Sequence, residues 1–128
     1  MKLLLDTNRL SDALAQVDEV IDQLEIAEAV YVPVVALGEI RSGFLGGQRA
    51  SKNNEARLQW FLSQSGIYVA GIDASVSHRY ALAHRALKSR GTPIPTNDLW
   101  IAAIALESGL VLYTRDLHFK KVPGLACF

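Results

Sequence analysis

The residues Lys2–Leu5, followed directly by Asp6, most constrain how this chain can fold. Three consecutive leucines run into a carboxylate with no turn residue between them. A short, continuous apolar run is typical of a central strand that is covered on both faces. In open parallel sheets, ligands bind beyond the carboxyl ends of the strands, which is where Asp6 would lie. We therefore predict a buried strand that ends at a polar site.

The rest of the chain alternates between strand-like and helix-like segments. Strands are predicted at 2–5, 29–32, 67–70 and 110–113, with 125–128 as the candidate for a fifth, at an edge. Helices are predicted at 11–14, 17–24, 33–44, 57–62, 73–88 and 96–106, and a loop at 48–54. This alternation indicates a single α/β domain over 1–128, with a central, mostly parallel sheet of four to five strands and helices on both faces.

Composition indicates a folded protein of the cytoplasm. Half of the residues are apolar, but no apolar run approaches the roughly 18 residues of a membrane span, so no membrane partner is expected. The first residues resemble the start of a signal peptide, but Asp6 ends the apolar run too early. The single cysteine, Cys127, cannot form an internal disulfide, which agrees with a reducing compartment.

Charge is balanced overall but unevenly distributed. Residues 1–28 hold seven acids and two bases, whereas residues 41–121 hold eleven bases and five acids. A local positive field can attract an anionic partner even when the net charge is zero. Ordinary solvated helix faces explain the same charges, so charge alone leaves both interpretations open.

Four carboxylates lie in apolar settings where a surface acid would be unusual: Asp6, Glu39, Asp98 and Asp116. Asp6 and Asp116 each follow a predicted strand, and parallel strands end on one side of a sheet, so these two can share a crevice. Asp98 begins an apolar helix, and Glu39 lies inside another. Each acid alone also has an ordinary explanation in a helix dipole, a turn or a buried ion pair.

Together the four acids indicate a metal site. Like charges about 5 Å apart repel by roughly 3 kcal/mol per pair at an effective dielectric near 20, so the ionised cluster needs a cation. The candidate ligands are hard oxygens, and His78, His84 and His118 are scattered, without a pair at ligand spacing. This set favours Mg²⁺ or Mn²⁺ over zinc. Such ions activate water and stabilise in-line phosphoryl displacement, so we predict hydrolysis of a phosphodiester.

Four short motifs of this chain resemble, in order, the acidic motifs of PIN-domain ribonucleases. They are Asp6-Thr7-Asn8, Glu39 within 38–43, Asn97-Asp98 within 97–103, and Thr114-Arg115-Asp116. The similarity is closest to the VapC toxins of toxin–antitoxin pairs, whose C-terminal ending resembles His118-Phe119 and the residues 122–125 here. The resemblance covers essentially the whole chain.

The resemblance implies a Mg²⁺- or Mn²⁺-dependent endoribonuclease whose catalytic, metal-binding residues are Asp6, Glu39, Asp98 and Asp116. It implies further that hydrogen bonds from neighbouring polar residues support the site: Thr7, Asn8, Asn97 and Thr114. The implied partners are a tRNA or rRNA substrate, a cognate antitoxin protein that covers the active-site groove, and a second copy of the chain in a homodimer. Arg9 departs from the family, which more often has an apolar residue there.

A groove that follows RNA phosphates needs cations. The candidates near the predicted site in sequence are Arg9, Arg41, Arg49, Lys52, Arg115 and Lys120. Each is also explained as solubilising surface charge. Trp60 and Trp100 could stack on bases, but their apolar helical settings favour core packing.

Other phosphate enzymes fit less well. A haloacid dehalogenase-type phosphatase needs a second aspartate two positions after the first, where this chain has Asn8, and a response-regulator receiver needs a phosphoacceptor after the third strand, where it has Gly71. Two alternatives remain. One is a non-catalytic PIN-like module for RNA binding or scaffolding, against which the complete acidic set argues. The other is a DNA-directed nuclease with the same metal site, although such enzymes usually carry additional helical segments.

Overall fold

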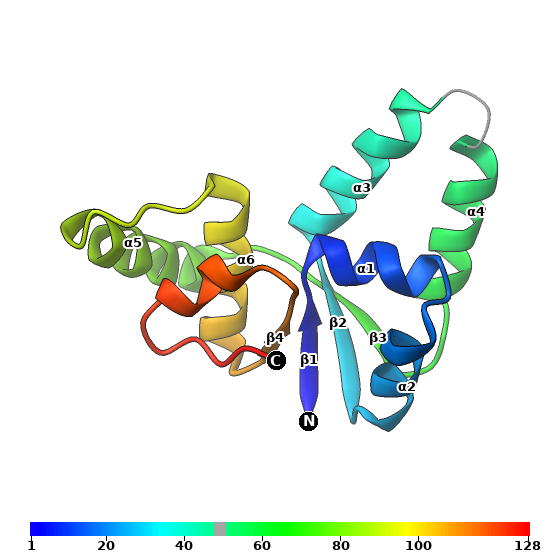
Figure 1. The fold of residues 1–128 in the computed structure, drawn as a ribbon, viewed down its shortest axis with the longest axis horizontal. Coiled ribbons are helices and arrows are strands. Elements are labelled where there is room, and N and C mark those ends of the chain that lie inside the picture. The colour runs from blue at the N-terminus through cyan, green and yellow to red at the C-terminus, as the bar shows by residue number, and fades with distance from the viewer. Residues whose placement is uncertain (48–50) are drawn as a thin grey trace.

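A parallel four-stranded sheet organises the computed structural model, which describes residues 1–47 and 51–128 (Figure 1). Its strands are β1 (Lys2–Leu5), β2 (Ala29–Pro33), β3 (Ile67–Ala70) and β4 (Val111–Tyr113). They lie in the order β3-β2-β1-β4, and every neighbouring pair is parallel. The predicted α/β class with a parallel central sheet is confirmed. The candidate fifth strand at 125–128 forms one isolated bridge, Leu112 to Cys127, and is not a regular strand.

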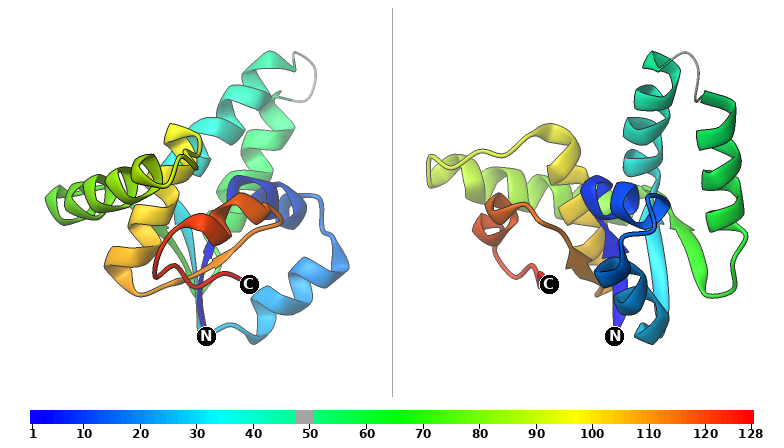
Figure 2. Two further views of the ribbon diagram at one scale, coloured as in Figure 1. Left: turned by 60° about the vertical axis from the view of Figure 1, so that its left-hand side comes forward. Right: turned by 45° about the vertical axis from the view of Figure 1, so that its right-hand side comes forward.

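Helices cover both faces of this sheet (Figure 2). On one face lie α1 (Thr7–Leu14), α2 (Asp18–Ile26), α3 (Val34–Gly46) and α4 (Ser51–Leu62). On the other lie α5 (Ala74–Ser89), α6 (Thr96–Ser108) and the short 3-10 helix η1 (Leu117–Lys121). In the part of the chain that the structure describes, no helix is long and apolar enough to cross a bilayer.

The leucine run of β1 is explained by its central position. Leu4 packs with the α5 and α6 side of the core, whereas Leu3 and Leu5 pack with the opposite side, and all three are at most 1% exposed. Because successive strand residues point to opposite faces, a strand covered on both faces is apolar at every position. The two halves of the core therefore meet at β1, and its carboxyl end is held between them.

Most predicted boundaries lie within two residues of those in the structure, but two places differ by more. The first helix begins at Thr7 and not at Ser11, because Asp6 serves as its N-cap and its Oδ1 accepts a hydrogen bond from the Thr7 N–H at 2.8 Å. Aspartate is among the residues preferred at this position. The predicted loop at 48–54 is shorter than expected, since α4 already begins at Ser51; its residues 48–50 lie outside the described chain.

The predicted packing of the two tryptophans holds for one of them. Trp100 stacks on Tyr80 with ring centroids 4.0 Å apart. Trp60 is 60% exposed, so the prediction of core packing is wrong there. The reason is that Leu58 and Phe61 form the inward face of α4, and Trp60 falls outside it.

The helix α6 is buried along almost its whole length, as its apolar sequence predicts. Its residues 101–105 are at most 1% exposed. Gly109 ends the helix in the left-handed conformation, with φ of 64°, which glycine adopts without steric cost. Asp98 lies in the first turn of this buried helix and is therefore held on a rigid element.

Candidate active site

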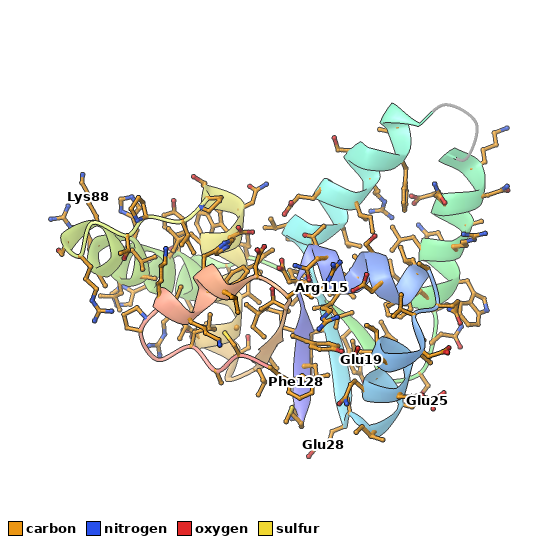
Figure 3. All side chains as sticks on the ribbon, viewed as in Figure 1. Glu19, Glu25, Glu28, Lys88, Arg115 and Phe128 are labelled. Carbon is orange, nitrogen blue, oxygen red and sulfur yellow. The ribbon has the colours of Figure 1, made fainter. Side chains whose placement is uncertain are left out.

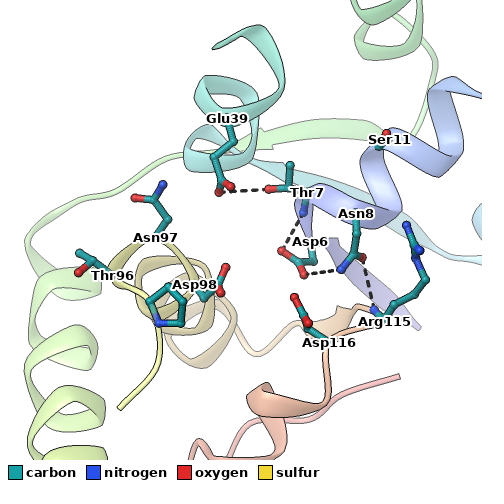
Figure 4. A pocket seen from close by; sticks show the side chains of 11 residues that line it. Asp6, Thr7, Asn8, Ser11, Glu39, Thr96, Asn97, Asp98, Arg115 and Asp116 are labelled. Carbon is teal, nitrogen blue, oxygen red and sulfur yellow. Dashed lines mark hydrogen bonds between the residues drawn. The ribbon is translucent and has the colours of Figure 1, made fainter. Parts of the chain in front are cut away.

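The four carboxylates Asp6, Glu39, Asp98 and Asp116 line one open pocket of about 700 Å³ (Figure 4). The pocket lies at the carboxyl ends of β1 and β4. Glu39 reaches it from α3 on one face of the sheet, and Asp98 reaches it from α6 on the other. Residues separated by more than one hundred positions are thus brought to the same edge of the sheet.

Asp6 is the one charged side chain classed as buried in the described structure, at 3% exposure. Its Oδ2 accepts hydrogen bonds from Thr114 Oγ1 at 2.7 Å and from Asn8 Nδ2 at 3.0 Å, while Oδ1 accepts from the Thr7 N–H. These three donors fix the orientation of the carboxylate. Burial raises the pKa of Asp6, and the hydrogen bonds from Thr114 and Thr7 oppose that rise.

Three of the four predicted supporting residues make hydrogen bonds inside the pocket. Thr7 Oγ1 donates to Glu39 Oε1 at 3.2 Å, and Thr114 Oγ1 accepts from the Asp116 N–H at 3.0 Å. Asn8 Oδ1 accepts from the Arg115 N–H at 3.3 Å. Asn97 lines the pocket, but within residues 1–47 and 51–128 its side chain has no hydrogen-bond partner. Thr114 therefore joins two of the acids, Asp6 and Asp116.

The environment disfavours ionisation of three of the acids, Asp6, Glu39 and Asp98. Burial raises the pKa of Glu39, and the charges of Asp98 and Asp6 raise it further against the hydrogen bond from Thr7. Burial also raises the pKa of Asp98; the charge of Asp6 adds to the rise and His118 opposes it. Three carboxyl groups thus share a pocket that would be stabilised by a positive charge.

His118 is a member of this cluster that the sequence interpretation missed. Its Nε2 lies 2.9 Å from Asp98 Oδ2, and its Nδ1 lies 3.8 Å from Asp116 Oδ1. The prediction that all candidate ligands are oxygens is therefore wrong, because His118 can offer a ring nitrogen. It is placed by η1, which starts immediately after Asp116. The signal in the sequence that could have identified His118 was its position two residues after the candidate ligand Asp116.

The donor set fits a divalent cation. Asp98, Asp116 and His118 can each offer one ligand atom, and these atoms all lie within 4.8 Å of one another. Asp6 and Glu39 line the same pocket and add further carboxylate oxygens. Oxygen-rich sets of this kind suit Mg²⁺ and Mn²⁺, and an imidazole is accepted by Mn²⁺ more readily than by Mg²⁺.

Three of the six cations predicted to bind RNA are paired with acids. Arg9 Nη1 lies 3.4 Å from Asp12, and its guanidinium stacks over the Tyr113 ring at 4.4 Å. Arg115 reaches the same Asp12 at 3.1 Å. These contacts neutralise two of the candidates, although Arg115 still lines the pocket.

The other predicted cations are not gathered at the pocket. Arg41 forms a close pair with Glu55 at 2.9 Å. Lys52 and Lys120 are exposed and do not line the pocket. Arg49 lies outside the described residues.

A second set of bases lies on and after α5 and is separate from the cations predicted to bind RNA. Residues 74–97 contain four bases and no acid; the bases are Arg79, Arg85, Lys88 and Arg90. Arg79 pairs with Glu107 at 3.0 Å, and the other three form no ion pair with any described residue. Lys88 lies at the outer end of α5 (Figure 3), and the segment 90–95 returns from there to the pocket, which Pro95 and Thr96 line.

The chain belongs to the PIN domain family, because the family model described as "PIN domain" matches residues 3–125. The resemblance drawn from the four acidic motifs is thereby confirmed.

Individual relatives carry names from toxin–antitoxin systems. "Ribonuclease VapC4" of Mycobacterium tuberculosis is 35% identical over 97 aligned positions, and the alignment covers 73% of this chain and 72% of that protein. "Toxin FitB" of Neisseria gonorrhoeae is 31% identical over 134 aligned positions, covering 98% and 96% of the two chains. The crystal structure of VapBC2 from Rickettsia felis, bound to a promoter DNA fragment, superposes with a TM-score of 0.91 at 25% identity and covers 100% of this chain and 98% of that one.

Proposed function

We propose that this protein is a Mg²⁺- or Mn²⁺-dependent endoribonuclease and the toxin of a toxin–antitoxin pair. The observation that carries the proposal is the convergence of Asp6, Glu39, Asp98 and Asp116 on one open pocket, with the pKa raised for the first three. Relatives named "Ribonuclease VapC4" and "Ribonuclease VapC2" support RNA as the substrate. A tRNA or an rRNA loop is the substrate class we propose.

The four carboxylates would hold the cation. When bound, a divalent ion supplies Lewis acidity to the phosphodiester and lowers the pKa of water. The chain's own part is positional: Thr114 and Asn8 fix Asp6, and Thr7 fixes Glu39. Preorganised ligands need no rearrangement before the reaction, which is why small displacements in such sites reduce rates strongly.

The bases on and after α5 would hold the RNA. Arg85, Lys88 and Arg90 carry no ion pair among the described residues, so their charge is available to phosphates. The segment that follows them leads directly to the pocket rim at Pro95 and Thr96. Phosphate contacts of this kind supply affinity without sequence preference. We therefore propose that RNA passes along α5 into the acidic pocket.

A cognate antitoxin is the proposed protein partner, and the active form is proposed to be a homodimer. One structural neighbour is the VapBC2 complex from Rickettsia felis. In such a pair the antitoxin would block the pocket and keep the ribonuclease inactive.

The proposal is tested by incubating the purified protein with tRNA, rRNA and single-stranded DNA in Mg²⁺, Mn²⁺ or EDTA, and by sequencing the cleaved ends. Wild-type protein should cut RNA only with metal, and Asp6→Asn should lose at least about 100-fold in rate, the loss typical when a positioned electrostatic group is removed. The control is Asp22→Asn, which makes the same chemical change on the exposed face of α2. Cleavage undiminished by EDTA, or equal cleavage by Asp6→Asn, refutes the metal mechanism. Faster cleavage of DNA than of RNA refutes the substrate.

A further inference from the structure

The ring of His118 lies at hydrogen-bond distance from one of the acids, but in an orientation that does not form a hydrogen bond. Its Nε2 is 2.9 Å from Asp98 Oδ2, yet this buried nitrogen has no hydrogen-bond partner in the described structure. The two atoms are close, but the oxygen lies away from the direction in which a ring N–H would point. A buried polar atom that is close to an oxygen and still unpaired needs a further partner.

The spacing suits two neighbouring ligands of one cation. Ligand atoms at about 2.1 Å from an octahedral ion lie roughly 3.0 Å apart when adjacent and roughly 4.2 Å apart when opposite. The Nε2 to Asp98 distance of 2.9 Å matches the adjacent case. An oxygen of Asp116 completes a set of three atoms within 4.8 Å, slightly wider than the coordinated geometry. Small side-chain rotations would close it around an ion.

The ring is held in this place by the chain on either side. η1 begins directly after Asp116, and Thr114 Oγ1 accepts the Asp116 N–H at 3.0 Å, which fixes the entry to this turn. On the other side, Phe119 is fully buried, and its ring lies 4.7 Å from that of His118. Moving the imidazole away from the pocket would disturb a buried core residue.

We infer that His118 is a nitrogen ligand of the catalytic cation and biases the site toward Mn²⁺ over Mg²⁺. The inference rests on the proposed function, because it needs a pocket that binds a cation. Mg²⁺ takes oxygen ligands and keeps its waters. Mn²⁺ also suits oxygen ligands, but as a first-row transition metal it accepts an imidazole nitrogen more readily than Mg²⁺ does. A histidine beside Asp98 and Asp116 therefore adds affinity for Mn²⁺ that Mg²⁺ does not share.

The test measures Mn²⁺ binding directly and does not depend on cleavage. Mn²⁺ affinity is obtained by titration followed by electron paramagnetic resonance, and nitrogen coordination by electron spin-echo modulation of the Mn²⁺-loaded protein, with ¹⁵N-histidine labelling as a check. Wild-type protein should show modulation from a directly bound nitrogen. His118→Ala should lose it and bind Mn²⁺ at least about tenfold more weakly, with a smaller change for Mg²⁺. His78→Ala, which removes an exposed histidine of α5, should behave as wild type.

His118→Gln provides a second variant of similar volume if the alanine variant does not fold, which circular dichroism will show. Bound Mn²⁺ without nitrogen modulation in the wild-type protein overturns the inference and leaves the proposed nuclease standing. Equal losses of Mn²⁺ and Mg²⁺ affinity in both His118 variants also overturn it, because they indicate a purely structural role. Failure of the wild-type protein to bind either ion, together with no metal-dependent cleavage, defeats the proposed function itself.

Discussion

Replacing Asp98 by asparagine should stabilise the metal-free protein and at the same time abolish its stabilisation by divalent cations. The side chain of Asp98 is 17% exposed, and one of its oxygens lies within 4.8 Å of an oxygen of Asp116. Two ionised carboxylates at this separation repel each other when no cation lies between them. Asparagine removes one of these charges with little change of shape.

The size of the effect follows from Coulomb's law. Two charges 4.8 Å apart repel by about 3.5 kcal/mol at an effective dielectric of 20 and by about 1 kcal/mol in bulk water. Because the Asp116 side chain is 51% exposed, solvent screens the pair, and a value of about 2 kcal/mol is reasonable. Removing the acid from the first turn of α6 forfeits about 0.3–1 kcal/mol of interaction with the helix dipole. The net gain is about 1 kcal/mol, or roughly 4 °C in melting temperature.

The assay is thermal unfolding at pH 7.5 in EDTA and in Mn²⁺ at about 100 times its dissociation constant. Metal at that level should stabilise the wild-type protein by about 2.7 kcal/mol. Asp98→Asn should gain little from the metal. Glu107→Gln is the control, because it neutralises an acid at the other end of α6 that pairs with Arg79 outside the pocket. The control should melt within about 0.5 kcal/mol of wild type and keep the full metal effect. A lower melting temperature for Asp98→Asn in EDTA would refute the reasoning from repulsion.

Three further outcomes follow from the same geometry. Folding raises the pKa of Asp6 and of Asp98 above the unfolded value near 3.8, so the metal-free protein should become more stable as pH falls from the folded pKa toward that value. Stabilisation by Mn²⁺ should instead disappear on acidification, because protonated carboxyl groups do not bind the ion. Thermal melts at pH 7 and pH 5, with and without metal, check both signs. Thr114→Val, which removes the 2.7 Å hydrogen bond to Asp6, should slow single-turnover RNA cleavage about tenfold or more while circular dichroism stays unchanged. Joint replacement of Arg85 and Lys88 by alanine should weaken RNA binding and lower the salt-dependence slope by about 1.4, measured by filter binding at several salt concentrations; an unchanged slope would exclude α5 from the RNA path.

The parts of the fold that could be predicted are those with a strong local pattern. The leucines of β1 and the apolar run of α6 are buried on all sides, so every position in them is apolar and the pattern is unambiguous. Their polar ends, Asp6 and Asp98, stand out against that background for the same reason. The start of α1 was missed because Asp6 was interpreted as a ligand alone, although aspartate is also a favoured helix cap.

The parts that could not be predicted depend on contacts between distant residues. Arg9 and Arg115 both pair with Asp12, and Arg115 is 103 positions from it, so no local pattern shows that these two cations are neutralised. His118 meets Asp98 across a sequence separation of 20 positions that contains the rest of α6 and all of β4. Sequence spacing identifies the residue types of a site, but the pairing of charges around it is decided by tertiary packing.

Asp6 also ties the assembly of the pocket to the cooperativity of the fold. Its backbone N–H donates to Tyr113 O at 3.0 Å, its carbonyl accepts the first intrahelical bond of α1 from Leu10 at 2.9 Å, and its carboxylate holds Thr7 and Thr114. A local opening that frees the end of β4 therefore breaks the backbone hydrogen bond between Asp6 and Tyr113, removes Thr114 from the Asp6 carboxylate and separates Asp6 from Asp116 in a single event. Amide hydrogen exchange at Asp6 would report this opening, and the pocket would be present or absent as a unit.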